Sequence, residues 1–281
     1  MIILEGVDKS GKSTTAVKLV NDLNLEMAKF GVPKGDPAEE YLPHLRLANK
    51  PKIYDRFIYG EIPYSIVKKR YRWFTWHDMK ILDLMVMSRP HIVLYHRPTR
   101  EVLAKRLENE PDDYVSIPEM HMLYDEYDEL FNEVSANSMV IDENTNYEVI
   151  KKYATEVVNG DWAKFKVWQD YGAPGIGVLN PTFLFVGERY NPNSPHQVTW
   201  WSKSGEFLLK SIRSANIPFK RCHFTNAITN EFNMITPDQV KLLAPKRIIC
   251  LGQVPRDVIN HALDKKKYDI RHLAHPAYWS R

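Results

Sequence analysis

The sequence lacks most features that mark secreted, membrane or metal-cluster proteins. Its 281 residues include only two cysteines, Cys222 and Cys250, without the paired spacing of a zinc or iron–sulfur site, so we expect two buried thiols. No stretch reaches the roughly 18 uncharged apolar residues of a membrane span. Met1 leads directly into an apolar run, without the regions of a signal peptide. These absences predict a cytoplasmic protein with no membrane partner.

Charge is unevenly distributed along the chain. The formal net charge is +3, but residues 161–281 hold 17 Lys and Arg against 9 Asp and Glu, whereas residues 1–160 hold 21 against 26. The basic half contains the clusters Lys220-Arg221, Lys246-Arg247 and Lys265-Lys266-Lys267. Such clusters suit a polyanion, and they are also typical of solvated surfaces. The sequence therefore suggests nucleic acid as a partner of the second half and leaves the oligomeric state open.

Short apolar runs alternate with segments of helical periodicity through residues 1–160. Such alternation predicts a parallel sheet flanked by helices. The predicted strands are residues 2–4, 52–54, 92–95 and 139–141, and the predicted helices are residues 13–23, 99–107 and 147–158. We expect these elements to form one α/β domain.

A second alternation follows a segment rich in glycine and proline, residues 161–178, which we interpret as a linker. Strands are predicted at 183–186, 223–225 and 247–251, and a helix at 205–214. Residues 179–281 should thus form a smaller α/β domain, with its ligand-binding loops at the strand ends.

The clearest motif lies between the first predicted strand and the first predicted helix. Gly6-Val7-Asp8-Lys9-Ser10-Gly11-Lys12-Ser13 fits the phosphate-loop pattern G-x-x-x-x-G-K-[ST]. In this pattern backbone N–H groups surround phosphate oxygens, the lysine reaches the β- and γ-phosphates, and the hydroxyl binds Mg²⁺. We therefore predict an ATP site with Mg²⁺ and phosphoryl transfer as the reaction.

The extended motif, Ile3-Leu4-Glu5-Gly6 through Thr14, resembles the thymidylate kinase family over roughly residues 1–158. The resemblance implies that Asp8 faces the acceptor, that Asp55-Arg56 lies near the transferred phosphate, that Arg106 lies on a lid helix and that residues 141–145 lie near the adenine. It implies these nucleotide-binding residues: Gly6, Val7, Asp8, Lys9, Ser10, Gly11, Lys12, Ser13, Thr14 and Arg106.

Four side chains are the candidate catalytic residues. Phosphoryl transfer needs positioned positive charge, which Lys12 and Arg56 can supply. Asp55 or Asp8 can orient an acceptor hydroxyl, and Ser13 with Asp55 forms the candidate Mg²⁺ site. The alternative for Asp55-Arg56 is an ion pair on the surface.

The sequence departs from the thymidylate kinase pattern after the first helix. The family's Arg-Glu-Pro-Gly-Gly-like segment is missing, and residues 31–41 replace it. Residues 64–76 interleave cations with aromatics, which suits phosphate contacts and base stacking; an amphipathic helix with its aromatics packed inward is the alternative. The missing segment argues against free dTMP as the acceptor.

The second half resembles the uracil-DNA glycosylase superfamily from about residue 181 to residue 281. The ordered pieces are Gly187-Glu188-Arg189-Tyr190-Asn191-Pro192, Thr225-Asn226, Leu251-Gly252 and His275-Pro276-Ala277. The resemblance implies a base- or DNA-binding site containing Glu188, Tyr190, Asn191, Asn226 and His275, in which a flipped base is read by hydrogen bonds. Tyr190 stands where the family has proline, which argues against glycosidic cleavage, and His275 is alternatively an ordinary loop histidine.

A kinase joined to a module for uracil-like bases resembles the 5-hydroxymethyluracil DNA kinases of bacteriophages. The resemblance implies transfer of a phosphoryl group from ATP to 5-hydroxymethyluracil in DNA, a step in thymidine hypermodification, within the cytoplasm of an infected host cell. Two alternatives remain: a deoxynucleoside monophosphate kinase acting on free dTMP or hydroxymethyl-dUMP, and a DNA-binding or repair protein with glycosylase activity.

Overall fold

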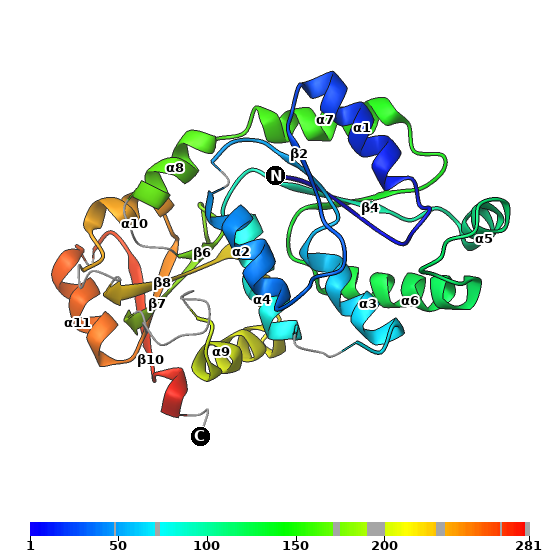
Figure 1. The fold of residues 1–281 in the computed structure, drawn as a ribbon. Helices are drawn as coiled ribbons and strands as arrows, with labels where there is room; N and C mark the ends of the chain where they lie inside the picture. The colour runs from blue at the N-terminus through cyan, green and yellow to red at the C-terminus, as the bar shows by residue number, and fades with distance from the viewer. Residues whose placement is uncertain are drawn as a thin grey trace. The chain divides into compact units, whose positions relative to one another are not determined.

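The computed structural model describes residues 1–47, 49–70, 74–170, 175–189, 200–228, 234–264 and 266–278. The chain forms two compact units, Met1–Asp83 with Pro90–Gly160, and Leu84–Arg89 with Asp161–Arg281. Each unit contains its own five-stranded sheet with helices around it (Figure 1). Within the described ranges, no helix is both long enough and apolar enough to cross a membrane.

The sheet of the first unit is parallel and has the strand order β2-β3-β1-β4-β5. Its three central strands, β1 (Ile2–Glu5), β3 (Ile53–Asp55) and β4 (Ile92–His96), are buried throughout, while β2 (Met27–Lys29) and β5 (Ser138–Ile141) form the edges. The parallel sheet expected from the apolar runs is therefore confirmed. Its carboxyl edge carries Glu5, Asp55 and His96, the last residues of the three central strands.

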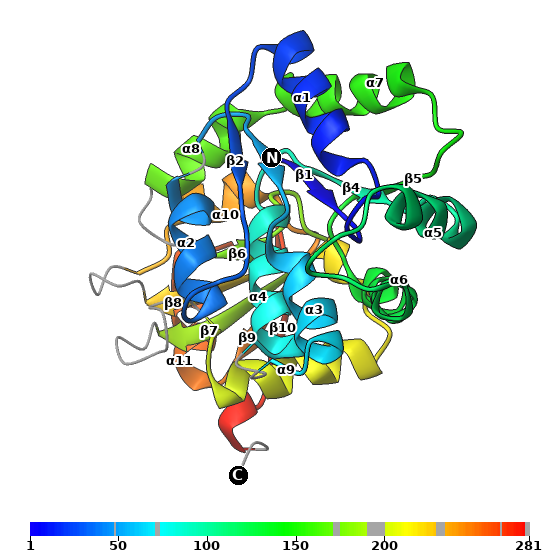
Figure 2. The ribbon, with the colours of Figure 1, turned by 45° about the vertical axis from the view of Figure 1, so that its right-hand side comes forward.

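Helices cover both faces of this sheet. Figures 1 and 2 show α1 (Lys12–Leu23) and α7 (Tyr147–Val158) on one face, and α3 (Glu61–Val67) and α6 (Ile117–Glu133) on the other. Tyr64, Val67, Leu123 and Tyr127 belong to the core between α3 and α6. The remaining helices are α2 (Pro37–Leu47), η1 (Ile58–Gly60), α4 (Trp76–Met87) and α5 (Arg100–Asn109).

The second unit has the strand order β10-β9-β7-β8-β6. β7 (Phe183–Arg189), β8 (Cys222–Ile228), β9 (Arg247–Leu251) and β10 (Asp269–Leu273) are parallel, and β6 (Ile176–Gly177) is antiparallel to β8. The helices are α8 (Trp162–Asp170), α9 (Lys203–Ser214), η3 (Phe219–Arg221), α10 (Pro237–Leu243), α11 (Gln253–Ala262) and η4 (Pro276–Tyr278). Both cysteines are buried free thiols, as expected.

Two segments differ from the sequence-based expectation. Residues 161–178 contain α8 and β6, because Phe165 and Trp168 at helical spacing are buried in the second unit and β6 pairs with β8. Residues 64–76 do not form one helix, since α3 ends at Val67 and α4 begins at Trp76.

Candidate functional site

The phosphate loop joins β1 to α1. Three of its residues have positive φ angles, a conformation that glycine adopts more readily than other residues. Gly6 has φ 134°, and a Cβ there would overlap the His96 carbonyl oxygen at the end of β4. Gly11, the N-cap of α1, has φ 101°, and Lys9 has φ 60°. The two motif glycines therefore occupy positions where a side chain is strained or has no room.

The amino terminus of α1 is suited to an anion. Gly11 supplies no side-chain cap, and the first turn of the helix contains no acidic residue. The free N–H groups and the positive end of the helix dipole therefore face the loop. This geometry matches the predicted role of residues 6–14 in phosphate binding.

Lys12 lies beneath this loop as a buried cation. Its Nζ donates to the carbonyl oxygens of Gly6 (2.8 Å) and Val7 (2.5 Å) and to Ser10 Oγ (3.3 Å). Burial lowers the pKa of Lys12 to about 8, although Asp55 and Glu5 oppose this change. The Lys12 ammonium is thus held at the loop by three acceptors that belong to the loop itself.

Ser13 and Asp55 meet across 42 positions of sequence. Ser13 Oγ donates to Asp55 Oδ2 at 2.8 Å, and Lys29 Nζ lies 3.9 Å from the same carboxylate oxygen. Asp55 is buried at the end of β3. A hydroxyl and a carboxylate are oxygen ligands of the kind that Mg²⁺ takes together with water and substrate phosphates, so the pair fits the expected metal.

Asp8 and Arg56 form a second pair at the same edge of the sheet. The Arg56 guanidinium donates to Asp8 Oδ1, and Tyr64 donates its hydroxyl to Asp8 Oδ2 at 2.6 Å. Arg56 has φ 66° and lies over the Tyr64 ring at 5.4 Å. Arg56 therefore pairs with Asp8, while Asp55 pairs with Ser13, which replaces the alternative of an Asp55–Arg56 surface pair.

Arg106 reaches the phosphate loop from α5. Its Nη1 donates to the carbonyl oxygen of Lys9 at 2.9 Å, and Lys9 in turn forms an ion pair with Glu110 at 3.0 Å. Thr99 caps α5 by accepting from the Val102 N–H. The helix thus holds the Arg106 guanidinium against the phosphate loop.

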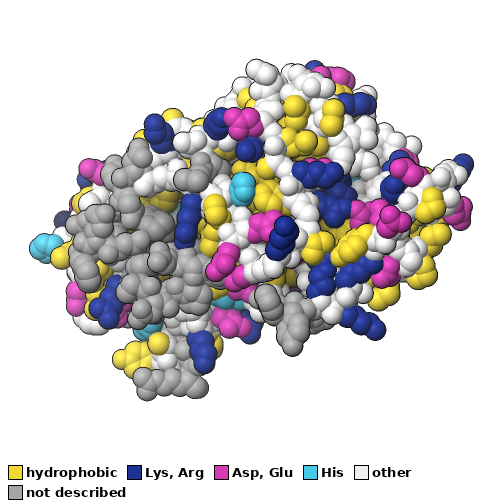
Figure 3. Space-filling model, in the orientation of Figure 1, with side chains coloured by type: hydrophobic (Ala, Val, Ile, Leu, Met, Phe, Trp, Pro, Cys, Tyr) yellow, Lys and Arg dark blue, Asp and Glu magenta, His cyan; other side chains and the backbone are white. Residues whose placement is uncertain are grey.

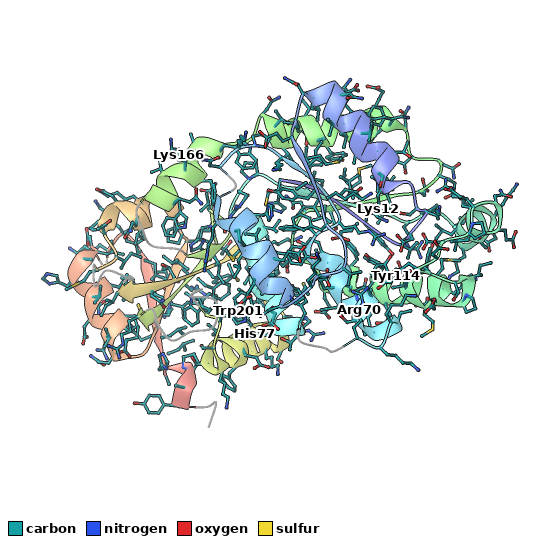
Figure 4. The ribbon with its side chains drawn as sticks, viewed as in Figure 1. Lys12, Arg70, His77, Tyr114, Lys166 and Trp201 are labelled. Atoms are coloured by element: carbon teal, nitrogen blue, oxygen red, sulfur yellow. The ribbon has the colours of Figure 1, made fainter. Side chains whose placement is uncertain are left out.

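Asp8, Lys12, Ser13, Arg56 and Arg106 line one open cavity of about 870 Å³. In Figure 4, Lys12 is labelled at the start of α1, and Figure 3 shows Lys and Arg side chains gathered in this part of the face. The cavity extends to the segment expected near the adenine. Its lining comprises residues 8–15, Lys18, Lys29, Arg56, His96, Pro98, Arg106, Asn109, Glu110, Asp112, Ile141, Asp142, Glu143, Thr145, Tyr147 and Ile150.

Two buried titratable residues of this edge were missed from the sequence. His96 ends β4 in the cavity wall, and burial lowers its pKa to about 3, so its imidazole is neutral. Glu5 ends β1 and accepts hydrogen bonds from the N–H of Phe57 (2.8 Å) and Tyr59 (3.3 Å), while burial raises its pKa to about 7. Each is a polar residue that closes an apolar run, which is the signal that could have identified them.

In the second unit three of the candidate base-binding residues, Glu188, Asn226 and His275, lie near the carboxyl ends of parallel strands. Gly187 of β7 pairs with Asn226 of β8, and a Cβ at Gly187 would come within 2.7 Å of both Asn226 Oδ1 and the Trp200 ring. Trp200 has φ 71°, and its buried Nε1 has no hydrogen-bond partner among the described residues. Glu188, also on β7, is exposed.

His275 follows β10 at the same edge, with β9 and β7 between it and Asn226. Its Nδ1 accepts from the Ala277 N–H at 3.1 Å, and its Cβ approaches Gly252. Tyr278, three residues on, is 77% exposed. Tyr190 and Asn191, the remaining two candidates, lie outside the described residues.

Comparison with known proteins finds similarity over about half of the chain. No protein-family model matches the sequence. The SPbeta prophage-derived uncharacterized protein YorR of Bacillus subtilis (strain 168) is 29% identical over 142 residues, which are 49% of this chain and 83% of YorR.

Solved structures give matches of similar extent. The crystal structure of YorR in complex with phosphorylated GDP has a TM-score of 0.48 and 24% identity, covering 56% of this chain and 95% of YorR. A deoxyadenosine kinase from M. mycoides with the products dCMP and a flexible dCDP bound has a TM-score of 0.38 and 16% identity, covering 56% of this chain and 98% of that chain.

Proposed function

We propose that this protein transfers the γ-phosphoryl group of ATP to the 5-hydroxymethyl group of 5-hydroxymethyluracil in DNA. One observation carries the proposal: Lys12, Arg56 and Arg106 come from three separate parts of the chain and line one cavity together with Asp8 and Ser13, whose hydroxyl donates to Asp55. Phosphoryl transfer depends on positioned charge of this kind.

The two carboxylates have different neighbours, which supports different roles. Asp55 accepts a hydrogen bond from Ser13, so this pair would hold Mg²⁺, which would supply positive charge to the phosphate groups. Asp8 lines the cavity and is held between Arg56 and Tyr64 rather than by Ser13, so we assign it to orient the acceptor hydroxyl. We therefore assign the metal to Asp55 and Ser13, and the acceptor to Asp8.

The proposed transfer exchanges one P–O bond for another. The acceptor hydroxyl oxygen forms a bond to the γ-phosphorus, the bond from that phosphorus to the β,γ-bridging oxygen breaks, and ADP leaves. The hydroxyl proton passes to the Asp8 carboxylate and then to solvent. Lys12, Arg56 and Arg106 balance the negative charge that develops on the phosphate oxygens.

The choice of DNA as the acceptor rests on the second unit. Many of its lysines and arginines are exposed, among them Lys203, Lys210, Lys220, Lys246 and Lys266. Polar candidates for reading a base edge, Asn226 and His275, lie near strand ends where open α/β sheets place ligands. A basic surface with such residues favours a polymer of nucleotides over a free nucleotide.

Labelled ATP tests the proposal. The purified chain is incubated with γ-labelled ATP, Mg²⁺ and either DNA containing 5-hydroxymethyluracil, the same DNA with thymine, or free hydroxymethyl-dUMP and dTMP. We expect label only in the hydroxymethyluracil DNA. Label in the free nucleotides alone would instead establish the monophosphate kinase, and release of free base would establish a glycosylase.

A variant in the second unit tests whether this unit contributes to binding of the DNA acceptor without affecting ATP binding. Asn226→Ala should raise the KM for hydroxymethyluracil DNA by roughly 5- to 150-fold, since a lost base contact costs about 1–3 kcal/mol, with ATP affinity unchanged. Asn180→Ala, also in the second unit and exposed, is the matched control. Equal DNA KM values for the two variants would remove Asn226 from the base site.

A further inference from the structure

The amino-terminal edge of the second unit's sheet is strongly basic. β7, β8, β9 and β10 are parallel, and their first residues, Phe183, Cys222, Arg247 and Asp269, are neighbours in the register. The chain segments that lead into these strands therefore reach the sheet at one edge, which we call the amino edge. Its described charged residues are Arg213, Lys220, Arg221, Lys246, Arg247, Lys266 and Lys267 against Asp264 and Asp269.

The carboxyl edge of the same sheet, where Asn226 and His275 lie, has no such excess of positive charge among its described residues. The strand ends and helix starts at this edge comprise residues 188–189, 200–207, 234–241, 252–257 and 274–278. Their charges balance, with Arg189, Lys203, Lys241 and Arg256 against Glu188, Glu206, Asp238 and Asp257. Of the two edges, the amino edge is therefore the one suited to a polyanion.

Two arginines of the amino edge are held beside one aromatic ring. The guanidinium carbons of Arg221 and Arg247 lie 5.7 Å and 6.0 Å from the centre of the Phe183 ring. Arg221 Nε donates to Thr182 Oγ1 at 3.2 Å, and Arg247 Nε donates to Asp269 Oδ2 at 2.5 Å. Because each bond uses Nε, the Nη groups of each guanidinium carry four further N–H donors. Both arginines are exposed, so a ligand can reach them.

The acidic residues of the amino edge leave its positive charge in excess. Asp269 also accepts from Arg271 Nε at 2.7 Å, and its hydrogen bonds to Arg247 and Arg271 hold the pKa of this carboxyl below its usual value. Asp264 Oδ1 accepts the backbone N–H of Lys266 at 3.0 Å. Within the described part of the chain, no ion pair is formed by the exposed lysines of this edge, which are Lys220, Lys246, Lys266 and Lys267.

We propose that the amino edge binds the backbone of a nucleic-acid strand, as a surface separate from the base site at the carboxyl edge. Lysines bind phosphates as point charges, and exposed guanidiniums also stack on bases. This combination favours a nucleic acid over an acidic protein segment. The proposal rests on the proposed function in one respect, because it takes the strand to be the DNA that carries the acceptor base.

The distance between the two edges sets a minimum length for a strand that contacts both. β7 has seven residues, which at about 3.3 Å per residue extend over about 20 Å. The phosphates of one strand are spaced by about 3.4 Å along a duplex, so a strand must continue for about six nucleotides beyond the base to reach the amino edge. A strand of four nucleotides therefore contacts one edge at a time, whereas a strand of 24 nucleotides can contact both.

Calorimetric titration without ATP tests the surface with two single strands, of 24 and of 4 nucleotides, each containing one 5-hydroxymethyluracil at an inner position. In the double variant Lys220→Ala with Lys246→Ala, the affinity for the 24-nucleotide strand should fall about 25-fold at about 0.1 M salt. Each phosphate contact contributes a factor of about 5 there, given a slope of about −0.7 for single strands. The affinity for the 4-nucleotide strand should change less than about twofold, and an equal fall for both strands would contradict two separate surfaces.

The matched control removes two exposed lysines from other parts of the same unit, Lys166 on α8 and Lys241 on α10. Lys166→Ala with Lys241→Ala should bind both strands as the unmodified chain does. Charge reversal, Lys220→Glu with Lys246→Glu, should weaken binding of the 24-nucleotide strand further than alanine does. Equal affinities of all three double variants for this strand would overturn the proposal.

Polyglutamate of 24 residues separates a surface for nucleic acid from one for acidic proteins. The unmodified chain should bind the 24-nucleotide strand at least tenfold more tightly than polyglutamate, because only the strand has bases for the two guanidiniums to stack on. Polyglutamate that binds as tightly as the strand, and is lost equally in Lys220→Ala with Lys246→Ala, would overturn the assignment to nucleic acid.

Phosphorylation of the bound strand keeps the two proposals apart. If the 24-nucleotide strand binds as expected but takes up no label from γ-labelled ATP, the surface at the amino edge stands and the proposed transfer is wrong. If the strand is labelled, and Lys220→Ala with Lys246→Ala binds it as tightly as the unmodified chain does, the transfer stands and the surface is wrong.

Discussion

At the scale of single residues, the nucleotide site depends on charged groups that meet from distant parts of the sequence. Ser13 and Asp55 are 42 positions apart, and Asp8 and Arg56 are 48 apart. The motif predicts which residue types are present, because phosphate chemistry requires them. It does not predict the pairing, because the partners meet only when β1 and β3 lie side by side in the sheet. Glu5 and His96 were also missed, although each is the polar residue that closes an apolar run.

Lys12→Ala should reduce phosphoryl transfer by at least a hundredfold, which is the usual order of effect for losing one stabilising charge or donor at a transition state. The buried ammonium is held by Gly6, Val7 and Ser10 at the loop, so alanine also removes support for the loop. Steady-state kinetics with labelled ATP measures the loss. Lys152→Ala, an exposed lysine on α7, serves as the control and should retain full activity.

Glu5 should make the stability of the protein depend on pH in an identifiable window. Its pKa is raised from 4.5 to about 7 by burial, so between these values the folded chain keeps a proton that the unfolded chain has released. The free energy of unfolding therefore falls as the pH rises through this window, by at most about 1.4 kcal/mol per pH unit. Above the pKa of about 7 the contribution of Glu5 no longer changes with pH.

The measurement is urea unfolding of the unmodified chain and of Glu5→Gln between pH 5 and pH 8. Glutamine keeps an acceptor for the Phe57 N–H but cannot ionise. The free energy of unfolding of Glu5→Gln relative to the unmodified chain should thus increase from pH 5 to pH 7 and then stay level. A difference that does not change with pH would mean that Glu5 has the same pKa in both states.

At the scale of elements, the unit of function is β1, the phosphate loop and α1. Gly6→Ala should destabilise this unit by roughly 1–3 kcal/mol and abolish nucleotide binding, because alanine is strained at φ 134° and its Cβ overlaps the His96 carbonyl. Thermal unfolding with and without ATP measures both effects. Gly31→Ala, where the added Cβ meets no atom within 4 Å, is the control. It should change the free energy of unfolding and that of nucleotide binding by no more than about 0.5 kcal/mol each.

The elements differ in how well the sequence reveals them. β1, β3 and β4 are buried apolar runs, and residues 147–158 have clear helical periodicity, so these elements were predicted. β2 has three residues, two of them exposed, and α2 contains Pro43. Neither segment carries the usual pattern, because tertiary contacts rather than local preference determine its conformation. In α8 the glycine and proline that follow the helix obscured its buried aromatics.

At the scale of the whole molecule, the contrast in charge between the two halves makes a prediction about salt. If the basic second half binds the DNA backbone, the logarithm of the DNA association constant should fall linearly with the logarithm of the salt concentration, with a slope of about −0.9 for each phosphate neutralised. Replacing exposed Lys266 and Lys267 together by alanine should make this slope less steep by about one to two.

Fluorescence anisotropy of a labelled oligonucleotide across a salt series measures the slope. The control is a double variant of exposed lysines in the first half, Lys50→Ala with Lys152→Ala, which should leave the slope unchanged. Equal slopes for both double variants would place the backbone contacts elsewhere on the chain. ATP affinity should be the same in all three proteins.

The position of Tyr64 has a consequence for the order of events in catalysis. One aromatic ring has the guanidinium groups of both Arg56 and Arg70 beside it, and its hydroxyl holds Asp8. A ligand that displaces either guanidinium changes the surroundings of the other. Thermodynamic linkage requires such an effect to be reciprocal, so the factor by which ATP changes acceptor binding should equal the factor by which the acceptor changes ATP binding. The first substrate to arrive would then set the affinity with which the second one binds.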